Sequence, residues 1–196
     1  MSKKYVAEGI GTFVLTLVVA LGLAGVFPVS VPILAALTLG LFVYTLGHVS
    51  GVHLNPAVTL GLWSLNKIST DETIKYIAAQ CVGAGVVLMV LPSLIPDVRV
   101  LTTATDFATG FAELLGTALF TFGVAAVVFG TVPSEQSGLI IGGSLLLGIA
   151  VAVLLGSNGV LNPAVALGIG SFNIMYVLGP IVGSMVGMRL YRYLAT

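Results

Sequence analysis

Charged residues are scarce in this chain. Lysine and arginine number 7 and aspartate and glutamate also 7 among 196 residues, so charged residues make up 7% and the formal net charge is zero. Ordinary soluble domains carry about 25% charged residues. With 58% hydrophobic residues, a soluble protein of this length could not cover its surface. The composition therefore predicts an integral membrane protein.

Cysteine, histidine and clusters of basic residues are scarce as well. The single cysteine, Cys81, excludes an internal disulfide framework, and its apolar surroundings favour a packing role. No basic patch is present that would favour a nucleic-acid partner. His48 and His53 have neither a cysteine nor a third histidine with which to complete a metal site. We therefore expect no metal and no cofactor, and hydrogen bonding within the loop for the two histidines.

Long hydrophobic runs are what the chain has in abundance. A helix needs about 20 residues to cross the hydrocarbon of a bilayer. Six segments meet this length: Tyr5–Val26, Val31–Val52, Glu72–Leu94, Phe107–Gly130, Ser137–Gly156 and Phe172–Ala195. The first has no polar flank with a cleavage site, so we expect it to be a retained helix and not a signal peptide.

Two further apolar stretches, Asn55–Ser64 and Asn162–Ser171, are too short to span a bilayer. Each begins with Asn-Pro-Ala, in which Asn is a good helix N-cap and Pro suits the first helical position. Both are predicted to be re-entrant half-helices, which are tolerated at membrane depth only when buried in protein or lining a water-filled cavity.

Basic residues predict the orientation of the chain in the membrane, because they favour the cytoplasmic side. With a cytoplasmic N-terminus, only Arg99 lies outside. The other six then fall on the cytoplasmic side: Lys3, Lys4, Lys67, Lys75, Arg189 and Arg192. The opposite orientation would place these six outside, so we expect both termini in the cytoplasm.

An internal repeat relates the two halves of what we expect to be a single domain, 1–196. The pattern Ala-Glu-x-x-Gly-Thr begins at Ala7 and again at Ala112, and Asn-Pro-Ala begins at Asn55 and Asn162. Each half holds three spans and one half-helix, so the second half enters the membrane from the opposite side. We therefore predict inverted repeats, approximately 5–66 with 67–94 and 107–171 with 172–195. Such repeats share a site near the midplane.

At these residues the chain resembles the aquaporin family over nearly its whole length. The matching segments are the Ala-Glu-x-x-Gly-Thr pair, 47–59, 76–84, 161–164 and 176–183. The resemblance implies an all-α membrane fold of six transmembrane helices and two half-helices, one pore per subunit, a homotetramer and a place in the plasma membrane. It also implies a passive channel for water, not an enzyme.

The resemblance assigns roles to particular residues. The pore centre would be formed by Asn55, Pro56, Ala57, Asn162, Pro163 and Ala164. Backbone carbonyls facing the water file would come from Gly51, Val52, His53, Asn158, Gly159 and Val160. Glu8 and Glu113 would anchor backbone N–H groups of the re-entrant loops. The two Asn amides would donate to a passing water, which interrupts the hydrogen-bonded chain that a proton needs.

The chain departs from the family at its selectivity filter. Most members have Arg after the second Asn-Pro-Ala, where this chain has Val165. The other filter positions align with Ala35, Gly159 and Ile149, or with Ala150 if the gap is placed differently. All are apolar and mostly small, so we predict a wide filter that passes water and at least one larger neutral solute such as urea, ammonia, glycerol or peroxide.

Three other hypotheses remain open. Arg99, in the loop between the halves, could supply the missing filter charge, although a solvated loop arginine is the simpler interpretation. A secondary transporter also uses inverted repeats with broken helices, but it would need a titratable or ion-binding group at the midplane. An intramembrane hydrolase would need a nucleophile motif, and the segment 47–51 has Ser and His without Gly-x-Ser-x-Gly.

Overall fold

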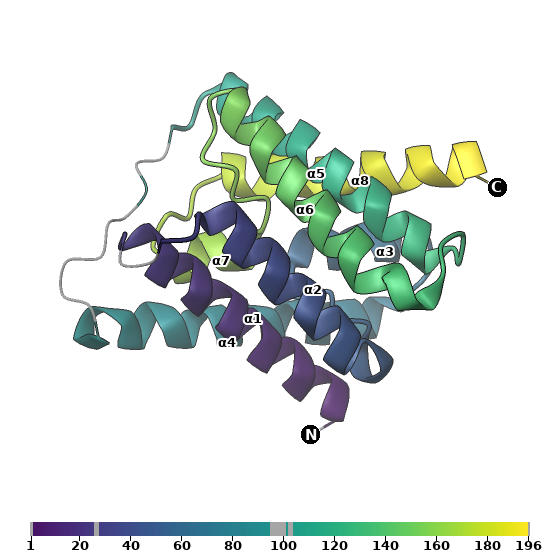
Figure 1. Cartoon of the computed structure of the whole chain (residues 1–196), viewed down its shortest axis with the longest axis horizontal. Helices are drawn as coiled ribbons and strands as arrows, with labels where there is room; N and C mark the ends of the chain where they lie inside the picture. The colour runs from purple at the N-terminus through teal and green to yellow at the C-terminus, as the bar shows by residue number, and fades with distance from the viewer. Residues whose placement is uncertain (1, 26–27, 95–100, 102–103, 196) are drawn as a thin grey trace.

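A computed structural model describes residues 2–25, 28–94, 101 and 104–195 (Figure 1). In this part of the chain every regular element is helical. The elements are α1 (Lys3–Leu23), α2 (Val31–Ser50), α3 (Pro56–Ser64), α4 (Thr70–Leu94), α5 (Phe107–Val128), the 3-10 helix η1 (Ser134–Gln136), α6 (Ser137–Leu154), α7 (Pro163–Gly168) and α8 (Met175–Ala195). The predicted all-α fold of long helices and two short ones is confirmed.

The long helices account for the predicted spans. Five of them are long and apolar enough to cross a membrane: α1, α2, α4, α5 and α6, the last counted together with η1. The sixth predicted span is α8, which has 21 residues and is long enough, but Arg189 and Arg192 lower the hydropathy of its last turns. It begins at Met175, three residues later than predicted, because the Asn173 side chain accepts hydrogen bonds from the N–H groups of Met175 and Tyr176.

The two half-helices begin where the Asn-Pro-Ala sequences predict. The Asn55 Oδ1 accepts a hydrogen bond from the Ala57 N–H at 2.8 Å, and the Asn162 Oδ1 accepts one from the Ala164 N–H at 3.0 Å. With 9 and 6 residues, α3 and α7 are about 14 and 9 Å long at 1.5 Å per residue, well short of a bilayer.

Glycines allow the long helices to pack closely in pairs. A Cβ at Gly83 of α4 would meet the Gly9 carbonyl of α1, and one at Gly183 of α8 would meet the Leu114 carbonyl of α5. Contact with backbone leaves no room for a side chain, as in other closely packed membrane helices. The two pairs, α1 with α4 and α5 with α8, therefore form the two sides of the molecule.

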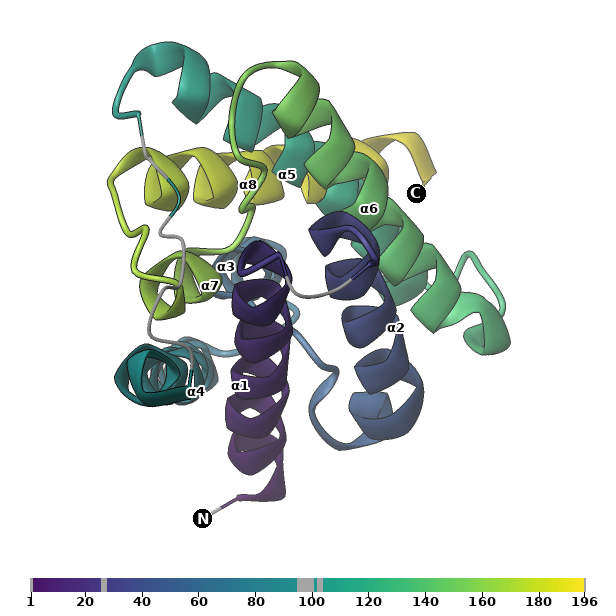
Figure 2. The same ribbon diagram turned by 60° about the vertical axis from the view of Figure 1, so that its left-hand side comes forward.

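The half-helices lie between these pairs. The α3 helix packs on α8 and α4, and α7 packs on α4, on α1 and, less extensively, on α8. Figure 2 shows α3 and α7 next to each other, with α8 on one side of them and α4 on the other. Each half-helix is thus held by long helices of both halves, which brings the two Asn-Pro-Ala sequences together inside the protein.

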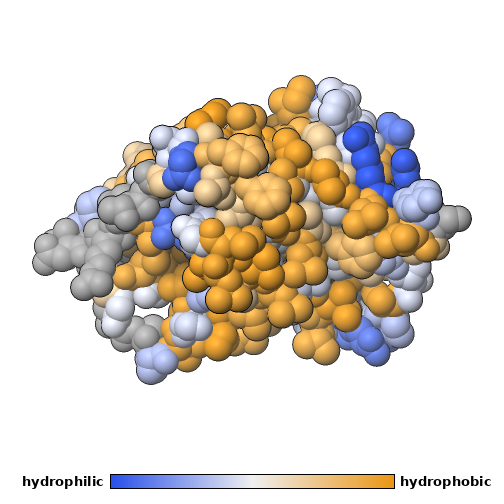
Figure 3. All heavy atoms as spheres, turned by 90° about the horizontal axis from the view of Figure 1, so that it is seen from above, coloured by the Kyte–Doolittle hydropathy of each residue, from blue (hydrophilic) through white to orange (hydrophobic). Residues whose placement is uncertain are grey.

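The surface agrees with a membrane environment. Large apolar side chains are exposed on the long helices, including Leu37, Leu41, Val82, Met89 and Leu147. Hydrophobic residues dominate the middle of the face seen in Figure 3, and hydrophilic residues gather mainly near its right-hand end. An apolar belt of this kind is stable only against lipid or other protein.

Candidate functional site

The side chains of the two Asn-Pro-Ala asparagines form reciprocal hydrogen bonds. The Asn55 Nδ2 donates to the Leu161 carbonyl at 2.9 Å, and the Asn162 Nδ2 donates to the Leu54 carbonyl at 2.9 Å. Each asparagine therefore holds the residue that precedes the other. A carboxamide has two N–H donors, so each Nδ2 can keep this bond and turn its second N–H toward the cavity that both residues line.

The loops before the asparagines have unusual backbone. Leu54 and Leu161 are fully buried at φ 47° and 53°, and Val52 has φ 52°. Non-glycine residues rarely adopt this left-handed conformation, which costs about 1–2 kcal/mol per residue. The conformation turns consecutive backbone N–H groups of each loop toward one buried carboxylate, which compensates the strain.

Glu8 holds the first loop from helix α1. Its side chain is fully buried, and its two oxygens accept four hydrogen bonds. The donors are the Ser50 hydroxyl (2.7 Å), the His53 N–H (2.9 Å), the Leu54 N–H (2.8 Å) and the Gln80 Nε2 (2.8 Å). Because Ser50 also accepts from the Val52 N–H at 3.0 Å, most of the loop depends on this one carboxylate.

Glu113 makes the equivalent contacts from helix α5. It is also fully buried and accepts hydrogen bonds from the Ser157 hydroxyl, from the Val160 N–H at 3.0 Å and from the Leu161 N–H at 2.7 Å. The structure thus brings each of the two predicted anchoring carboxylates to the re-entrant loop of its own half.

Among the described residues, the more extensive polar network surrounds the first loop, whereas in the second loop the Asn158 Nδ2 donates to the Tyr176 hydroxyl at 2.8 Å. Thr59 donates its hydroxyl hydrogen to the Asn55 carbonyl at 3.0 Å, and the same oxygen lies 3.0 Å from Gln80 Nε2 and 3.1 Å from His53 Nδ1. The Thr59 hydroxyl has one hydrogen, which it donates to the Asn55 carbonyl. We therefore assign a hydrogen to the His53 Nδ1, which donates it to the Thr59 oxygen. The ring of His53 also lies against Tyr76, with 4.8 Å between ring centroids.

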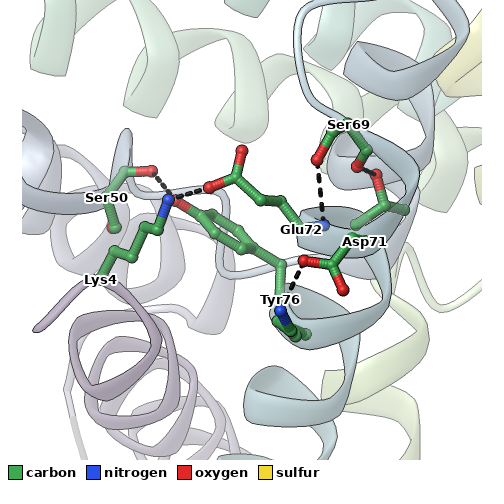
Figure 4. A network of polar contacts seen from close by, with 8 residues as sticks. Lys4, Ser50, Ser69, Asp71, Glu72 and Tyr76 are labelled. Carbon is green, nitrogen blue, oxygen red and sulfur yellow. Dashed lines mark hydrogen bonds and ion pairs between the residues drawn. The ribbon is translucent and has the colours of Figure 1, made fainter. Parts of the chain in front are cut away.

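Tyr76 links this region to the end of the membrane-spanning helices. Its hydroxyl donates to the Ser50 carbonyl at 2.8 Å, where α2 ends. Figure 4 shows this contact beside the ion pair of Lys4 with Glu72, which joins α1 to the start of α4. Ser69 caps α4 by accepting from the Glu72 N–H at 3.2 Å. Together these contacts fix α1, α2 and α4 around the first loop.

Two cavities reach the first loop at His53, and one of them also reaches both asparagines. The first, cavity 1, has a volume of about 290 Å³ and is lined by both asparagines and by all four predicted filter residues, Ala35, Ile149, Gly159 and Val165. Among the described residues that line it, none is Lys, Arg, Asp or Glu. The predicted filter positions, which come from four different segments of the chain, are therefore neighbours around one apolar space.

The second cavity, cavity 2, has a volume of about 550 Å³ and is lined by His48, His53, Val58 and residues of α2, α5 and α6. The predicted carbonyl residues divide between the two spaces. Asn158, Gly159 and Val160 line cavity 1, whereas Gly51 and Val52 line cavity 2 and His53 lines both. Within the described ranges, no three His, Cys, Asp or Glu side chains are grouped so that they could hold a metal ion.

Comparison with known proteins identifies the family. The family model described as Major intrinsic protein matches residues 1–191. The chain belongs to the major intrinsic protein family. Among its relatives, the probable aquaporin AqpM of Archaeoglobus fulgidus is 30% identical over 245 positions, which cover 100% of this chain and 98% of that protein.

Aquaporin-4 of Bos taurus is 31% identical over 183 positions, covering 82% of this chain and 56% of that protein, so the chain spans about half the length of such relatives. The X-ray structure of the aquaglyceroporin from Plasmodium falciparum superposes with a TM-score of 0.69 at 22% identity, covering 98% of this chain and 94% of that one. At this identity the similarity shows the fold alone, which is that of an aquaporin-like membrane protein.

Several residues of this family member take part in the site although sequence reasoning gave them no role. Ser50 and Ser157 hold the carboxylates, Thr59 and Gln80 extend the first network, and Phe120 lines both cavities. The two serines had a visible signal, since each stands five residues before its asparagine. Phe120 had none, because it lies among other apolar residues of a spanning segment.

Arg99, the residue considered as a substitute for the missing filter arginine, lies outside the described residues. That hypothesis therefore stays untested. The nearby Leu101 lines cavity 1, and its carbonyl accepts a hydrogen bond from the Ser171 hydroxyl at 3.3 Å.

Proposed function

We propose that the protein is a passive transmembrane channel for water and other small neutral solutes. The observation that carries this proposal is the reciprocal bonding of Asn55 and Asn162. It holds two carboxamides side by side on the wall of one cavity, deep inside a bundle of membrane-length helices. A water oxygen can accept from both amides, and a water held in this way cannot pass a proton along the file.

Ion exclusion follows from the same place. Both half-helices have their N-termini at the asparagines, and a helix N-terminus carries about half a positive elementary charge. The backbone N–H groups of Leu54 and Leu161 already donate to the two carboxylates. The backbone carbonyls of the loops therefore remain as the groups that can accept hydrogen bonds from water. We assign this role to the carbonyls of residues 51–53 and 158–160.

The filter that we propose consists of Ala35, Ile149, Gly159 and Val165. It has no fixed cation and no side-chain donor, so a solute meets little steric or electrostatic selection there. We expect urea, ammonia, glycerol or peroxide to enter with water. The relatives named as aquaporins and aquaglyceroporin support a channel over an enzyme, and the amide-lined centre supports a channel over an ion-coupled transporter.

We further propose the arrangement in the membrane. The equivalent contacts of Glu8 and Glu113 support inverted repeats over 5–66 with 67–94 and 107–171 with 172–195. The basic residues near both ends of the chain support cytoplasmic termini. A homotetramer in the plasma membrane, with one pore per subunit, is the assembly that the family resemblance implies.

Stopped-flow light scattering on proteoliposomes tests the proposal. In an impermeant osmolyte, vesicles with the protein should shrink faster than protein-free vesicles. In urea or glycerol, they should shrink and then swell again as the solute enters. Val165→Arg is the matched variant and should slow solute entry more than water flow. Water flow equal to that of empty vesicles contradicts the channel; water flow with complete exclusion of urea, glycerol and ammonia contradicts the wide filter.

A further inference from the structure

Cavity 1 is amphipathic. Its polar side chains belong to the re-entrant loops and to the asparagines that cap α3 and α7, and they are His53, Asn55, Asn158 and Asn162. The other side chains that line it are apolar, and most of them come from the long helices α1, α2, α5 and α6. The hydrogen-bonding groups of the cavity are therefore concentrated on the loop side, and the long helices supply apolar walls.

Two aliphatic stripes run along these walls. They are Leu15, Val19 and Leu23 of α1 and Leu145, Ile149 and Val153 of α6. Residues four apart lie on one face of a helix, so each stripe is continuous and about 12 Å long at 1.5 Å per residue. Leu23 is the last residue of α1 and Val153 is the last but one of α6. Each stripe thus extends from the middle of its helix to the C-terminal end.

The size and charge of cavity 1 suit a small uncharged organic molecule. Its volume is about 290 Å³, and an apolar cavity of about 150 Å³ is enough to bind benzene. Among the described residues that line cavity 1, none is Lys, Arg, Asp or Glu, so a charged guest would lose its hydration without gaining an ionic partner. Apolar walls with a few convergent polar groups are typical of ligand-binding cavities.

We propose that cavity 1 is a binding site for short-chain aliphatic primary amides, and that an amide such as butanamide or hexanamide bound there blocks water flow. The proposal rests on the channel function proposed above. The amide oxygen accepts from the Nδ2 groups of Asn55 and Asn162, and the alkyl chain lies along the two aliphatic stripes. A guest held at the asparagine pair takes the place of the water that would pass there.

The half-helices favour this neutral head group over an ammonium group with the same chain. Both have their N-termini at the asparagines, and each N-terminus carries about half a positive elementary charge. An ammonium group would meet these two positive ends without a carboxylate in the lining. A primary amide instead has both an acceptor for the asparagines and donors for the loop carbonyls assigned above.

The residues that follow the two Asn-Pro-Ala sequences provide matched variants. Val165 lines cavity 1, whereas Val58, its equivalent in the first half, lines cavity 2. Threonine keeps the shape of valine and adds a hydroxyl, so Val165→Thr makes the wall of cavity 1 less favourable for an alkyl chain, and Val58→Thr does not alter that wall. Val153→Thr, on the α6 stripe, is a second cavity 1 variant if Val165→Thr does not fold.

Stopped-flow light scattering on proteoliposomes would measure water flow in an impermeant osmolyte, with the same amide concentration on both sides of the bilayer. The series runs from acetamide to hexanamide, and each result is expressed as a fraction of the same variant's flow without amide. Protein-free vesicles report any effect of the amides on the bilayer. Hexylammonium, with the same chain as a six-carbon alkyl guest but a cationic head, tests the charge preference.

Hexanamide should block water flow saturably, and the concentration for half-block should fall about fourfold with each methylene added from propanamide to hexanamide. This concentration should rise several-fold in Val165→Thr and stay unchanged in Val58→Thr, and hexylammonium should not block. Water flow that hexanamide does not reduce, equal sensitivity of the two variants, or block by hexylammonium overturns the site and leaves the channel intact. A wild-type protein that conducts no water overturns the channel and this proposal with it.

Discussion

The two re-entrant loops share one plan but differ in the support around it. In both, a buried glutamate accepts from a serine hydroxyl and from the N–H groups before the asparagine. Only the first loop adds a threonine, a histidine and a glutamine. The corresponding residues of the second half are Ala166, Val160 and Pro180. The contacts common to both loops are thus those that hold the asparagine pair, and the polar network around the first loop is an addition.

In the second half, the corresponding region is stabilised by close contact between helix backbones. Gly179, Gly183 and Gly187 of α8 all meet backbone carbonyls of α5, whereas in α4 the equivalent residues are Ala79, Gly83 and Val87. Asn158 adds a hydrogen bond from its Nδ2 to the Tyr176 hydroxyl at 2.8 Å. The first loop is therefore tied to α4 by several buried polar groups, whereas the second loop has one such contact to α8 and depends more on the closer approach of α5 and α8.

Removing the carboxylates should have the largest effect. Each buried donor left without a partner costs about 1 kcal/mol or more, so Glu8→Ala, with four donors, should lower the free energy of unfolding by roughly 4 kcal/mol and Glu113→Ala, with three, by roughly 3 kcal/mol. Unfolding titrations with SDS in mixed micelles would measure both. Glu8→Gln and Glu113→Gln keep the shape and should fall between wild type and alanine. A larger loss for Glu113→Ala would contradict the ranking.

The glycine contacts should come next. In Gly183→Ala the new methyl meets the Leu114 carbonyl, which is backbone and cannot rotate away; overpacking of this kind costs about 1–3 kcal/mol. The same unfolding titration applies. Gly85→Ala is the control on α4, because a Cβ there meets nothing within 4 Å, and it should be neutral or slightly stabilising since alanine favours helix. An unaffected Gly183→Ala would mean that close approach does not hold the second half.

The features that both halves share could be predicted from the sequence. Asn55 and Asn162 begin helices by their own side-chain chemistry, and a repeated Glu in an apolar span indicates a buried partner, so half-helices and anchors could be expected. Of the additions, a hydrogen bond of His53 was expected, but neither its partner Thr59 nor the glutamine contact could be. Gln80 meets Glu8 across 72 residues of chain, and no local pattern carries a contact of that range. The filter role of Val165 and its neighbours came from the family resemblance and stays a prediction.

The polar network should contribute less than either feature. Thr59→Val removes the hydroxyl that joins His53, Gln80 and the Asn55 carbonyl while keeping the volume. A double-mutant cycle with Gln80→Leu should give a coupling of about 1 kcal/mol, as for hydrogen-bonded neighbours. Ser50→Ala with Ser157→Ala is the control cycle and should be additive, because these residues belong to different loops. Additivity of the first pair as well would show that the network adds nothing to stability.

The smallest effect on stability should come from the N-terminal caps of α1 and α5, the first helices of the two halves. Helix α5 has a side-chain cap, in which the Asp106 Oδ1 accepts from the Thr109 N–H at 2.8 Å, whereas the N-cap of α1, Ser2, makes no side-chain cap hydrogen bond. The Thr109 N–H holds the pKa of Asp106 below its ordinary value of 3.8.

A lowered pKa in the folded state means that the cap stabilises the protein above the ordinary pKa and that this stability is lost as the pH falls through the folded value. Asp106→Asn keeps an acceptor without a charge, so it should remove this acid dependence and leave neutral stability nearly unchanged, while Asp106→Ala should lower stability at neutral pH. Thermal unfolding of wild type and both variants from neutral to acid pH measures the difference. Ser2→Ala, the matched change in the first half, should alter neither profile; a shift in Ser2→Ala as large as that in Asp106→Ala would remove this contrast between the halves.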